Sequence, residues 1–220
     1  MENNYMRQLY DFFGRLEINN DRTWFAAHKP EFDNLRSQLL ADIQRLIDTM
    51  AQYDSSLNGL DANDTIYRIY RDIRFSPIKL PYKTHLGAVI ARGGKRCIQS
   101  CYYVHFEPGQ SGLFGGLWEP SSDLLRKLRD EIDTNIDEFI DIVESPQFTS
   151  RFSWAGRTLK TMPKGYPREH PYAKYLKMKE YLVQMPTPDE FFFANDWVEK
   201  AAEHFKVLKP LNDFLNYVFE

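Results

Sequence analysis

The hydrophobic positions of the first fifty residues recur at helical spacing. A helix is predicted over residues 6–16, with Leu9, Phe12, Phe13 and Leu16 on its apolar face. Asp21 is expected to cap a short second helix. Pro30 suits the first turn of a third, longer helix, whose buried stripe is formed by Leu35, Leu39, Ile43, Leu46 and Met50.

After a loop at residues 55–64 the apolar positions alternate, which is typical of a β-strand. The apolar face of this predicted strand consists of Tyr67, Ile69, Ile73 and Phe75. Arg71 falls on the same face. Because a buried arginine needs a partner, we expect Arg71 either in an internal ion pair or at the floor of a site.

The next segment, residues 85–106, predicts a β-hairpin. Gly93 and Gly94 stand at its centre, and glycine tolerates the positive φ angles of a tight turn. A glycine-rich loop is expected to follow over residues 108–120. It lacks the lysine and hydroxyl ending of a phosphate-binding P-loop, so its glycines are expected either in a plain turn or where the backbone approaches a ligand.

The C-terminal half is expected to be mainly helical. Ser121 or Ser122 caps the first of its helices, which is kinked near Asn135. Short strands and loops are expected over residues 147–170. The other predicted helices cover residues 172–181, residues 196–208 and a last segment that starts at Pro210.

Helices, strands, helices, small strands and helices thus follow one another without regular alternation. This order predicts an α+β fold with a mainly antiparallel sheet packed with several helices, rather than an alternating parallel α/β fold. No repeat or break in composition marks a second domain, so residues 1–220 are expected to form a single domain.

Composition excludes several classes of protein. Hydrophobic residues make up 43% of the 220 positions, which is too many for a disordered chain. No apolar run reaches the roughly 18 residues of a membrane-spanning helix, and the N-terminal residues do not resemble a secretory signal. Two cysteines cannot form a disulfide scaffold and are expected to be structural thiols. We therefore expect a soluble, cytoplasmic protein without a membrane partner.

Charge is segregated along the chain, although the formal net charge is only −3. Residues 64–105 hold eight basic and two acidic side chains, and residues 151–179 hold eight basic and one acidic. The remaining positions hold 12 basic and 28 acidic residues. These two basic segments either converge on one anion site, where their fields add, or neutralise the acidic helices packed against them.

The densest group of cations lies within residues 68–84. Arginines offer forked donors for phosphate or carboxylate, and lysines add point charges. The second basic segment would add further donors, and Tyr82 would form a stacking or hydrogen-bonding wall. The candidate ligand-binding residues are Arg71, Arg74, Lys79, Tyr82, Lys83, Lys160, Lys164 and His170.

Evidence for catalytic chemistry is weaker. Asp72 lies among three arginines and is either a salt-bridge partner that fixes their geometry or a general base held ionised by them. His170 is either an acid–base group or a loop residue that orients the chain before Pro171. The five histidines have no metal-ligand spacing, so neither a metal nor another cofactor is predicted. Whether the protein is an enzyme stays open.

The string RIYRDIRFSPIKLPYKT, residues 68–84, resembles the hallmark of a mostly bacterial, uncharacterised family known as domain of unknown function 2461. Three further strings agree with that family in order: FFGRLEINNDRTWFAAHKPEF, YYVHFEPGQSGLFGGLWEPSSDLLRKLRDEI and LKTMPKGYPREHPYAKYLKMKEYLV. The resemblance implies one α+β domain in a bacterial cytoplasmic protein, with no established activity. One departure is that Ile78 and Leu80 flank Lys79, where the family usually has an acidic residue and a threonine.

Three functions are compatible with these features. The first is a pocket for a phosphorylated or otherwise anionic small ligand, which requires the two basic segments to adjoin. The second is a structural or protein-interaction domain whose basic segments pair internally. The third is a nucleic-acid-associated protein, although a pI near 6.0 argues against a general nucleic-acid binder. The oligomeric state stays open.

Overall fold

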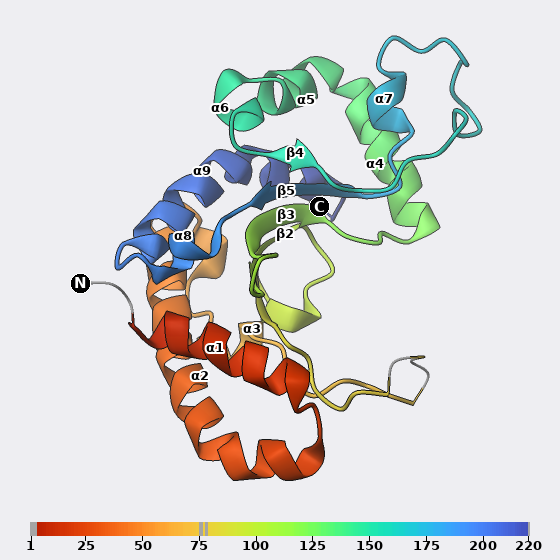
Figure 1. Ribbon diagram of the computed structural model, residues 1–220. Coiled ribbons are helices and arrows are strands. Elements are labelled where there is room, and N and C mark those ends of the chain that lie inside the picture. Colours follow the sequence, from red (N-terminus) through yellow and green to blue (C-terminus); the bar gives the residue numbers. More distant parts are fainter. Residues whose placement is uncertain (1–3, 75–76, 78, 220) are drawn as a thin grey trace. The chain divides into compact units, whose positions relative to one another are not determined.

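The computed structural model describes residues 4–74, 77 and 79–219 (Figure 1). It combines helices with an antiparallel sheet, which confirms the predicted α+β class. The chain forms two compact units. Unit 1 consists of Met1–Arg96, Tyr103–Leu113 and Pro186–Glu203, and unit 2 of Cys97–Tyr102, Phe114–Met185 and His204–Glu220. The single domain expected for residues 1–220 stays a prediction.

The sheet has the strand order β1-β2-β3-β5-β4. Its strands are β1 (Leu86–Ile90), β2 (Cys101–Phe106), β3 (Gly112–Leu117), β5 (Tyr181–Pro186) and β4 (Ser153–Trp154). Side chains alternate along β2, so that Tyr102, Val104 and Phe106 are buried. The half-buried opposite face of β2 therefore carries Tyr103 and His105.

In unit 1, α1 packs against both α2 and α8. The helical segments of this unit are α1 (Asn4–Ile18), α2 (Arg22–Met50), η1 (Ser55–Leu57), α3 (Ala62–Thr65), η2 (Gly94–Arg96) and α8 (Asp189–Phe193). Asp21 caps α2 as predicted, because its side chain accepts hydrogen bonds from the backbone of Thr23 and Trp24. The apolar faces predicted for α1 and α2 are buried.

Two prolines lie inside helices, which the sequence analysis did not predict. Pro30 was expected to start a helix, but α2 runs through it from Arg22 to Met50. Pro210 likewise lies inside α9 (Trp197–Asn216). A proline removes one backbone hydrogen bond and strains the preceding turn. Buried apolar side chains before and after each proline offset that cost, as Phe25 and Phe32 do around Pro30.

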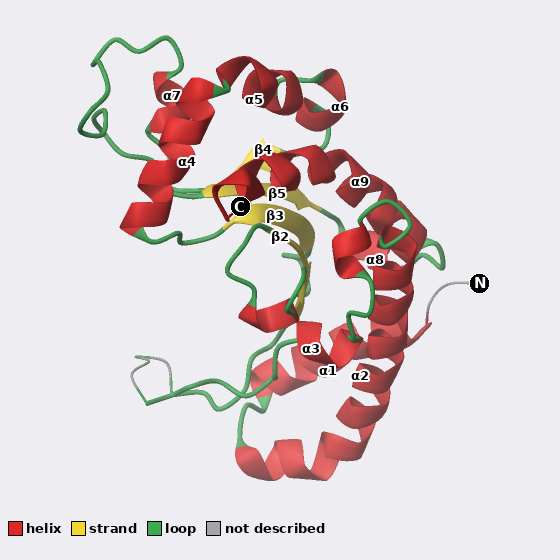
Figure 2. Ribbon diagram, turned by 180° about the vertical axis from the view of Figure 1, so that it is seen from behind, coloured by secondary structure: helices red, strands yellow, loops and turns green. Residues whose placement is uncertain are grey.

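The strand predicted from Thr65 is wrong. The described residues between α3 and β1 are drawn as loop (Figure 2), and they form only two isolated bridges, Ile66 with Ala88 and Tyr70 with Tyr82. Tyr67 is 38% exposed instead of sharing a buried face with Ile69. Phe75, the last residue of the predicted face, lies outside the described residues. Pro81 cannot donate to a ladder, which explains why the pairing stays discontinuous.

The predicted hairpin is confirmed as the neighbouring strands β1 and β2, but its connection is longer than a tight turn. Gly93 and Gly94 have φ angles of 88° and 55°, as expected, and Gly94 then begins the short helix η2. Irregular residues continue to Ser100. Cys97 lies in this connection and Cys101 in β2, and both thiols are free. Burial raises the pKa of Cys101 to about 12, which agrees with a structural role.

Unit 2 contains α4 (Ser122–Thr134), α5 (Ile136–Val143), α6 (Pro146–Thr149), α7 (Ala173–Leu176) and η3 (Tyr217–Phe219). Ser121 caps α4, and the helix breaks at Asn135 as predicted. The helix expected over residues 172–181 is wrong, because α7 is only four residues long and Tyr181 begins β5. The ring of Tyr181 packs instead in the core against Phe139.

The segment predicted as a glycine-rich loop over residues 108–120 contains the strand β3. Gly116 has a φ of 96°, and a Cβ there would lie 2.0 Å from the carbonyl oxygen of Tyr181. A Cβ on Gly115 would lie 2.2 Å from Leu208. These glycines therefore allow the close approach of β3 to its neighbours in unit 2.

We expect Gly116→Ala to lower the free energy of unfolding by at least about 2 kcal/mol, because it combines backbone strain with a steric clash. Gly14→Ala is the matched control. Gly14 lies in α1, a Cβ added to it would meet nothing within 4 Å, and the substitution should stabilise the fold by about 0.5–1 kcal/mol. Urea unfolding measures both values. Equal effects of the two substitutions would contradict this account of Gly116.

Candidate functional site

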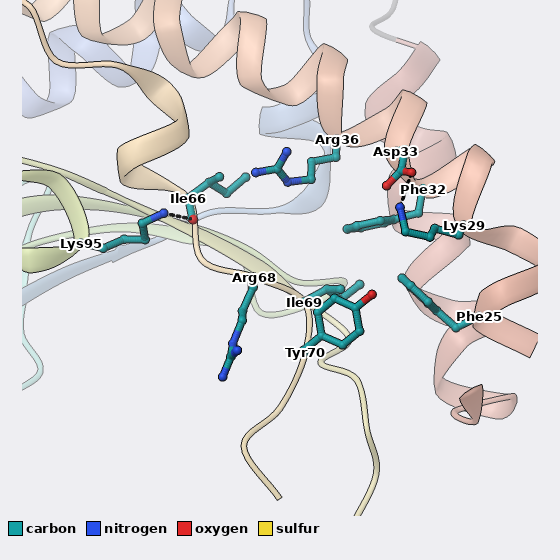
Figure 3. Close-up of a pocket in the computed structure, with 10 residues that line it drawn as sticks. All are labelled: Phe25, Lys29, Phe32, Asp33, Arg36, Ile66, Arg68, Ile69, Tyr70 and Lys95. Atoms are coloured by element: carbon teal, nitrogen blue, oxygen red, sulfur yellow. Dashed lines mark hydrogen bonds and ion pairs between the residues drawn. The ribbon is translucent and has the colours of Figure 1, made fainter. Parts of the chain in front are cut away.

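A cavity of about 300 Å³ lies in unit 1, between α2 and the segment that joins α3 to β1 (Figure 3). This volume is at the lower end for small-molecule sites. Phe25 and Phe32 from α2 and Tyr70 from the segment form its aromatic wall, and Ile66 and Ile69 add aliphatic surface. The Tyr70 side chain is exposed, with its ring 5.9 Å from that of Phe25.

The polar lining of this cavity is mainly cationic. It consists of Lys29, Asp33, Arg36, Arg68 and Lys95. Lys29 forms an ion pair with Asp33, and the ammonium of Lys95 donates to the carbonyl oxygens of Asn63 and Ile66. Within the part of the chain that the structure describes, Arg36 and Arg68 have no ion pair or hydrogen bond. Arg36 extends from α2 toward Ile66, while the Arg68 side chain starts from the opposite wall and points away from Arg36 in this view (Figure 3).

Three of the predicted anion-binding residues are bound to their own segment. Arg74 is 76% exposed and forms a double hydrogen bond with the carboxylate of Asp72, at 2.9 and 2.6 Å. The ammonium of Lys79 donates to the carbonyl oxygen of Ile73 at 2.9 Å. Arg71 is half-buried, and its Nε donates to the carbonyl oxygen of Tyr82 at 2.8 Å. Among the described residues, the partner of Arg71 is therefore a neutral backbone carbonyl and not the carboxylate of an internal ion pair, which was one of the two expectations for it.

Tyr82 is part of the core of unit 1. It is 5% exposed, and its ring stacks on Phe25 with the centroids 4.0 Å apart. Its backbone exchanges two hydrogen bonds with the side-chain amide of Asn20, both 3.1 Å long. The structure thus places Tyr82 behind the aromatic wall of the cavity.

Asp72 sits beside a cation, as both of its interpretations require. The Arg74 guanidinium, through its hydrogen bonds, holds the pKa of the Asp72 carboxyl well below its usual range. Such a carboxylate is a poor proton acceptor near neutral pH. The geometry is that of the salt-bridge partner considered for Asp72.

Lys83 differs from the other predicted cations. It is half-buried, and its ammonium lies 5.5 Å from the centre of the Tyr67 ring. Burial, followed by the nearby charges of Arg71 and Arg68, lowers the pKa of Lys83. The charges of Lys83, Arg71 and Arg68 therefore repel one another. An anion placed among these three cations would reduce that repulsion.

The other predicted cations belong to unit 2. Lys160 and Lys164 are exposed. His170 is mostly buried, and its Nε2 lies 2.9 Å from a carboxylate oxygen of Asp133, while its Nδ1 accepts from the backbone of Tyr172. The convergence of the two basic segments stays a prediction.

Several cations of the second basic segment pair with acidic residues. Arg157 bonds to both Glu180 and Glu119, and Lys174 lies 2.7 Å from Glu144. With His170 and Asp133, these pairs are those expected if the segment neutralises acidic side chains within unit 2.

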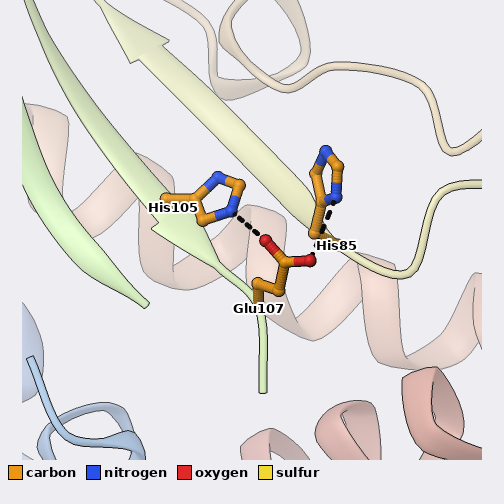
Figure 4. Close-up of side chains that lie close together, drawn as sticks. All are labelled: His85, His105 and Glu107. Atoms are coloured by element: carbon orange, nitrogen blue, oxygen red, sulfur yellow. Dashed lines mark hydrogen bonds and ion pairs between the residues drawn. The ribbon is translucent and has the colours of Figure 1, made fainter. Parts of the chain in front are cut away.

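A second group of polar side chains lies at the ends of β1 and β2 in unit 1. It consists of His85, which precedes β1, His105 near the end of β2, and Glu107, which follows β2 (Figure 4). Nε2 of His105 lies 2.7 Å from one carboxylate oxygen of Glu107, and Nδ1 of His85 lies 3.8 Å from the other. All three side chains are half-buried.

The environment of His85 keeps its imidazole neutral near pH 7. Burial, then the neighbouring His105, lowers the pKa of His85 to about 4. Lys83 and Arg71 act in the same direction, and Glu107 opposes them. The first basic segment and this histidine group are therefore electrostatically coupled within unit 1.

The sequence alone did not predict most of the residues that line the cavity, or the group formed by His85, His105 and Glu107. Arg36 is far from the first basic segment in the sequence, although both line the cavity. No local pattern distinguishes it from an arginine that is simply exposed to solvent. A signal did exist for His105 and Glu107, because two residues separated by one position share a face of a strand. His85 lies twenty residues earlier, and only the pairing of β1 with β2 brings it to the same place.

The fold and these sites define an α+β protein with an antiparallel sheet. In the described residues, no helix is both long and apolar enough to cross a membrane. The family model of a conserved hypothetical protein, DUF2461, matches residues 8–214, and the chain belongs to that family. The resemblance noted from the sequence is thereby confirmed. Comparisons with curated proteins and with solved structures gave no match.

The pair formed by Arg157 and Glu180 predicts a pH-dependent contribution to stability. The Arg157 guanidinium lowers the pKa of Glu180 below its usual 4.5, so the ionised form stabilises the fold above that pH. At pH 7 we expect Glu180→Gln to lower the free energy of unfolding by about 1–2 kcal/mol. The difference from the wild type should shrink as the pH falls from about 4.5 through the lowered pKa of Glu180, because the unfolded chain then binds a proton that the folded chain takes up only at lower pH.

Glu119→Gln is the control, since Glu119 shares Arg157 at 3.1 Å but is 65% exposed. Its cost should be below about 0.5 kcal/mol. Urea unfolding at pH 7 and pH 4 measures these values. An equal cost for both variants, or a cost of Glu180→Gln that does not depend on pH, would contradict the prediction.

Proposed function

We propose that this protein binds a phosphorylated or otherwise anionic small ligand in the cavity between α2 and the segment joining α3 to β1. One observation carries the proposal. The cavity is lined by four cationic side chains, Lys29, Arg36, Arg68 and Lys95, and by one acidic side chain, Asp33. A cavity of this kind concentrates positive charge beside an apolar wall.

The distribution of partners supports Arg36 and Arg68 as the residues that meet the anion. Lys29 and Lys95 already have partners, whereas the two arginines have neither an ion pair nor a hydrogen bond among the described residues. A guanidinium that is not paired internally can offer its forked donors to phosphate or carboxylate.

The aromatic wall supports a ligand with a planar or apolar part next to its anionic group. Phe25, Phe32 and Tyr70 line the same cavity, and Tyr70 is the exposed ring of the three. Ring stacking and apolar contact supply affinity, while charged donors fix orientation. The family resemblance also supports a bacterial and cytoplasmic protein, and we include both in the proposal.

The test is a thermal-shift screen of the full chain against inorganic phosphate, nucleotides, sugar phosphates, aromatic carboxylates and short single-stranded DNA, at low and moderate salt. We expect one class of small anion to raise the melting temperature, because a ligand that binds the folded state stabilises it. Arg36→Gln and Arg68→Gln should each weaken binding of that ligand by about tenfold or more, as measured by calorimetry.

Arg45→Gln is the matched control, because Arg45 lies on α2 but is held near Asp42 and Glu199 and does not line the cavity. Its affinity for the ligand should equal that of the wild type. Binding of no small anion, or equal weakening by all three substitutions, would reject the proposal. Binding only to DNA, with a steep loss as salt rises, would favour the nucleic-acid hypothesis instead.

We also propose a structural role for the second basic segment, residues 151–179. The support is its pairing with acidic side chains of unit 2: Arg157 with Glu180, His170 with Asp133 and Lys174 with Glu144. A segment with this role contributes to the stability of unit 2 rather than to ligand affinity. Lys160→Gln and Lys164→Gln should then leave the affinity for the small anion unchanged in the same calorimetric measurement.

A further inference from the structure

We propose that His85, His105 and Glu107 bind one divalent transition-metal ion, with Zn²⁺ as the best match to this set of ligands. The site is separate from the cavity that carries the proposed anion site, and the inference does not depend on that function. Two imidazoles and one carboxylate are a ligand set that Zn²⁺ uses in catalytic sites.

The geometry brings the three ligand atoms to nearly the required spacing. One nitrogen of each histidine and one carboxylate oxygen all lie within 4.8 Å of one another. Ligands about 2.0–2.2 Å from a tetrahedral ion are separated by about 3.3 Å, so small rotations of the side chains suffice. In Figure 4 the Glu107 carboxylate lies between the two imidazole rings. An ion would replace the hydrogen that now bridges His105 and Glu107.

An unsatisfied nitrogen supports this assignment. Nδ1 of His85 is buried and has no hydrogen-bond partner among the described residues. It faces a carboxylate oxygen of Glu107 at 3.8 Å, which is too long for a hydrogen bond. Buried polar atoms in native proteins nearly always have a partner, and a bound ion can be that partner where the protein supplies none.

The second nitrogen of His105 is also held in place. Its Nδ1 lies 3.0 Å from the hydroxyl of Tyr103, one pleat earlier on β2. When Nε2 binds a metal, Nδ1 keeps its proton and donates a hydrogen bond to the tyrosine oxygen. Metal-binding histidines usually have such an outer partner, which fixes the orientation of the ring. Gly87 provides the space, because a Cβ there would lie 2.0 Å from the Tyr103 hydroxyl.

Nearby cations affect both the binding of the metal ion and the choice of its remaining ligand. Lys83 and Arg71 act electrostatically on His85 and oppose the binding of a cation, whereas the charge of Glu107 favours it. Three protein ligands also leave at least one coordination position open, as in catalytic rather than structural zinc sites. A water molecule or an anion oxygen can occupy that position, and the cations favour an anion.

Metal titration of the full chain tests the site. The protein is treated with a chelator, dialysed into chloride buffer without phosphate, and titrated with Zn²⁺ by calorimetry and with Co²⁺ by visible absorption. We expect one ion per chain with a Kd of about 1 µM or tighter. Bound Co²⁺ should give d–d absorption bands that are more intense than those of free Co²⁺ in the same buffer. Because no ligand anion is present, failure of the anion proposal would not affect this result.

Two variants distinguish the site from adventitious binding. Glu107→Gln keeps the shape of the side chain and removes its charge, and we expect its affinity for Zn²⁺ to fall by at least about 100-fold. Tyr103→Phe removes the hydroxyl that is the outer partner of His105 and should weaken binding by about tenfold. Both variants are checked for an unchanged circular dichroism spectrum, and a variant that fails this check is replaced by His105→Gln.

His170→Gln is the matched control. Its imidazole pairs with a carboxylate, as that of His105 does, and the two side chains are equally buried at 14% and 16% exposed. His170 does not belong to a group of three possible ligands in the described residues, so its loss should leave the metal affinity unchanged. The proposal is overturned if Zn²⁺ binds more weakly than about 100 µM, or if Glu107→Gln binds it as tightly as the wild type.

Discussion

The packing of Tyr82 on Phe25 is the contact on which both candidate sites depend. It anchors a long loop segment that has little regular hydrogen bonding of its own. Asn20 reinforces the anchor by bonding to both backbone groups of Tyr82. On one side, the anchored segment forms the wall of the cavity opposite α2. On the other, it leads into β1 and positions His85, which directly precedes that strand. Burial of two aromatic rings can hold such a segment because stacking adds to the free energy of apolar contact.

The cations of this protein fall into two groups with different physical roles. Those with a nearby carboxylate or carbonyl, such as Arg74, Lys79 and Arg157, have little interaction left to offer a ligand. Those without such a partner among the described residues, such as Arg36 and Arg68, retain their donors. Counts of charge along the sequence cannot separate these groups, because the partner is chosen by the folded geometry. The basic segments were a correct indication of local charge but a poor guide to the individual residues that line a cavity.

Interruptions in the sequence pattern were harder to interpret than the pattern itself. Pro30 and Pro210 are typical of helix starts, yet each lies inside a helix. The apolar contacts before and after each proline stabilise the helix by more than the loss of one backbone hydrogen bond destabilises it. The alternation after Thr65 looks like a strand, yet its described residues pair only at isolated bridges. The glycines of β3 look like a loop, yet they allow strands and a helix to approach closely. In each case tertiary contacts outweighed a local preference.

The sequence by itself determined the α+β class, the apolar faces of α1 and α2, the cap at Asp21, the break at Asn135 and the family. These features depend on neighbouring residues, whose spacing fixes which side chains share a face. The tertiary structure alone decided which of the described cations keep their donors for a ligand, and it alone brought His85 beside His105 and Glu107. Such sites join residues far apart in the chain, and their distances depend on strand pairing and helix packing rather than on spacing along the sequence.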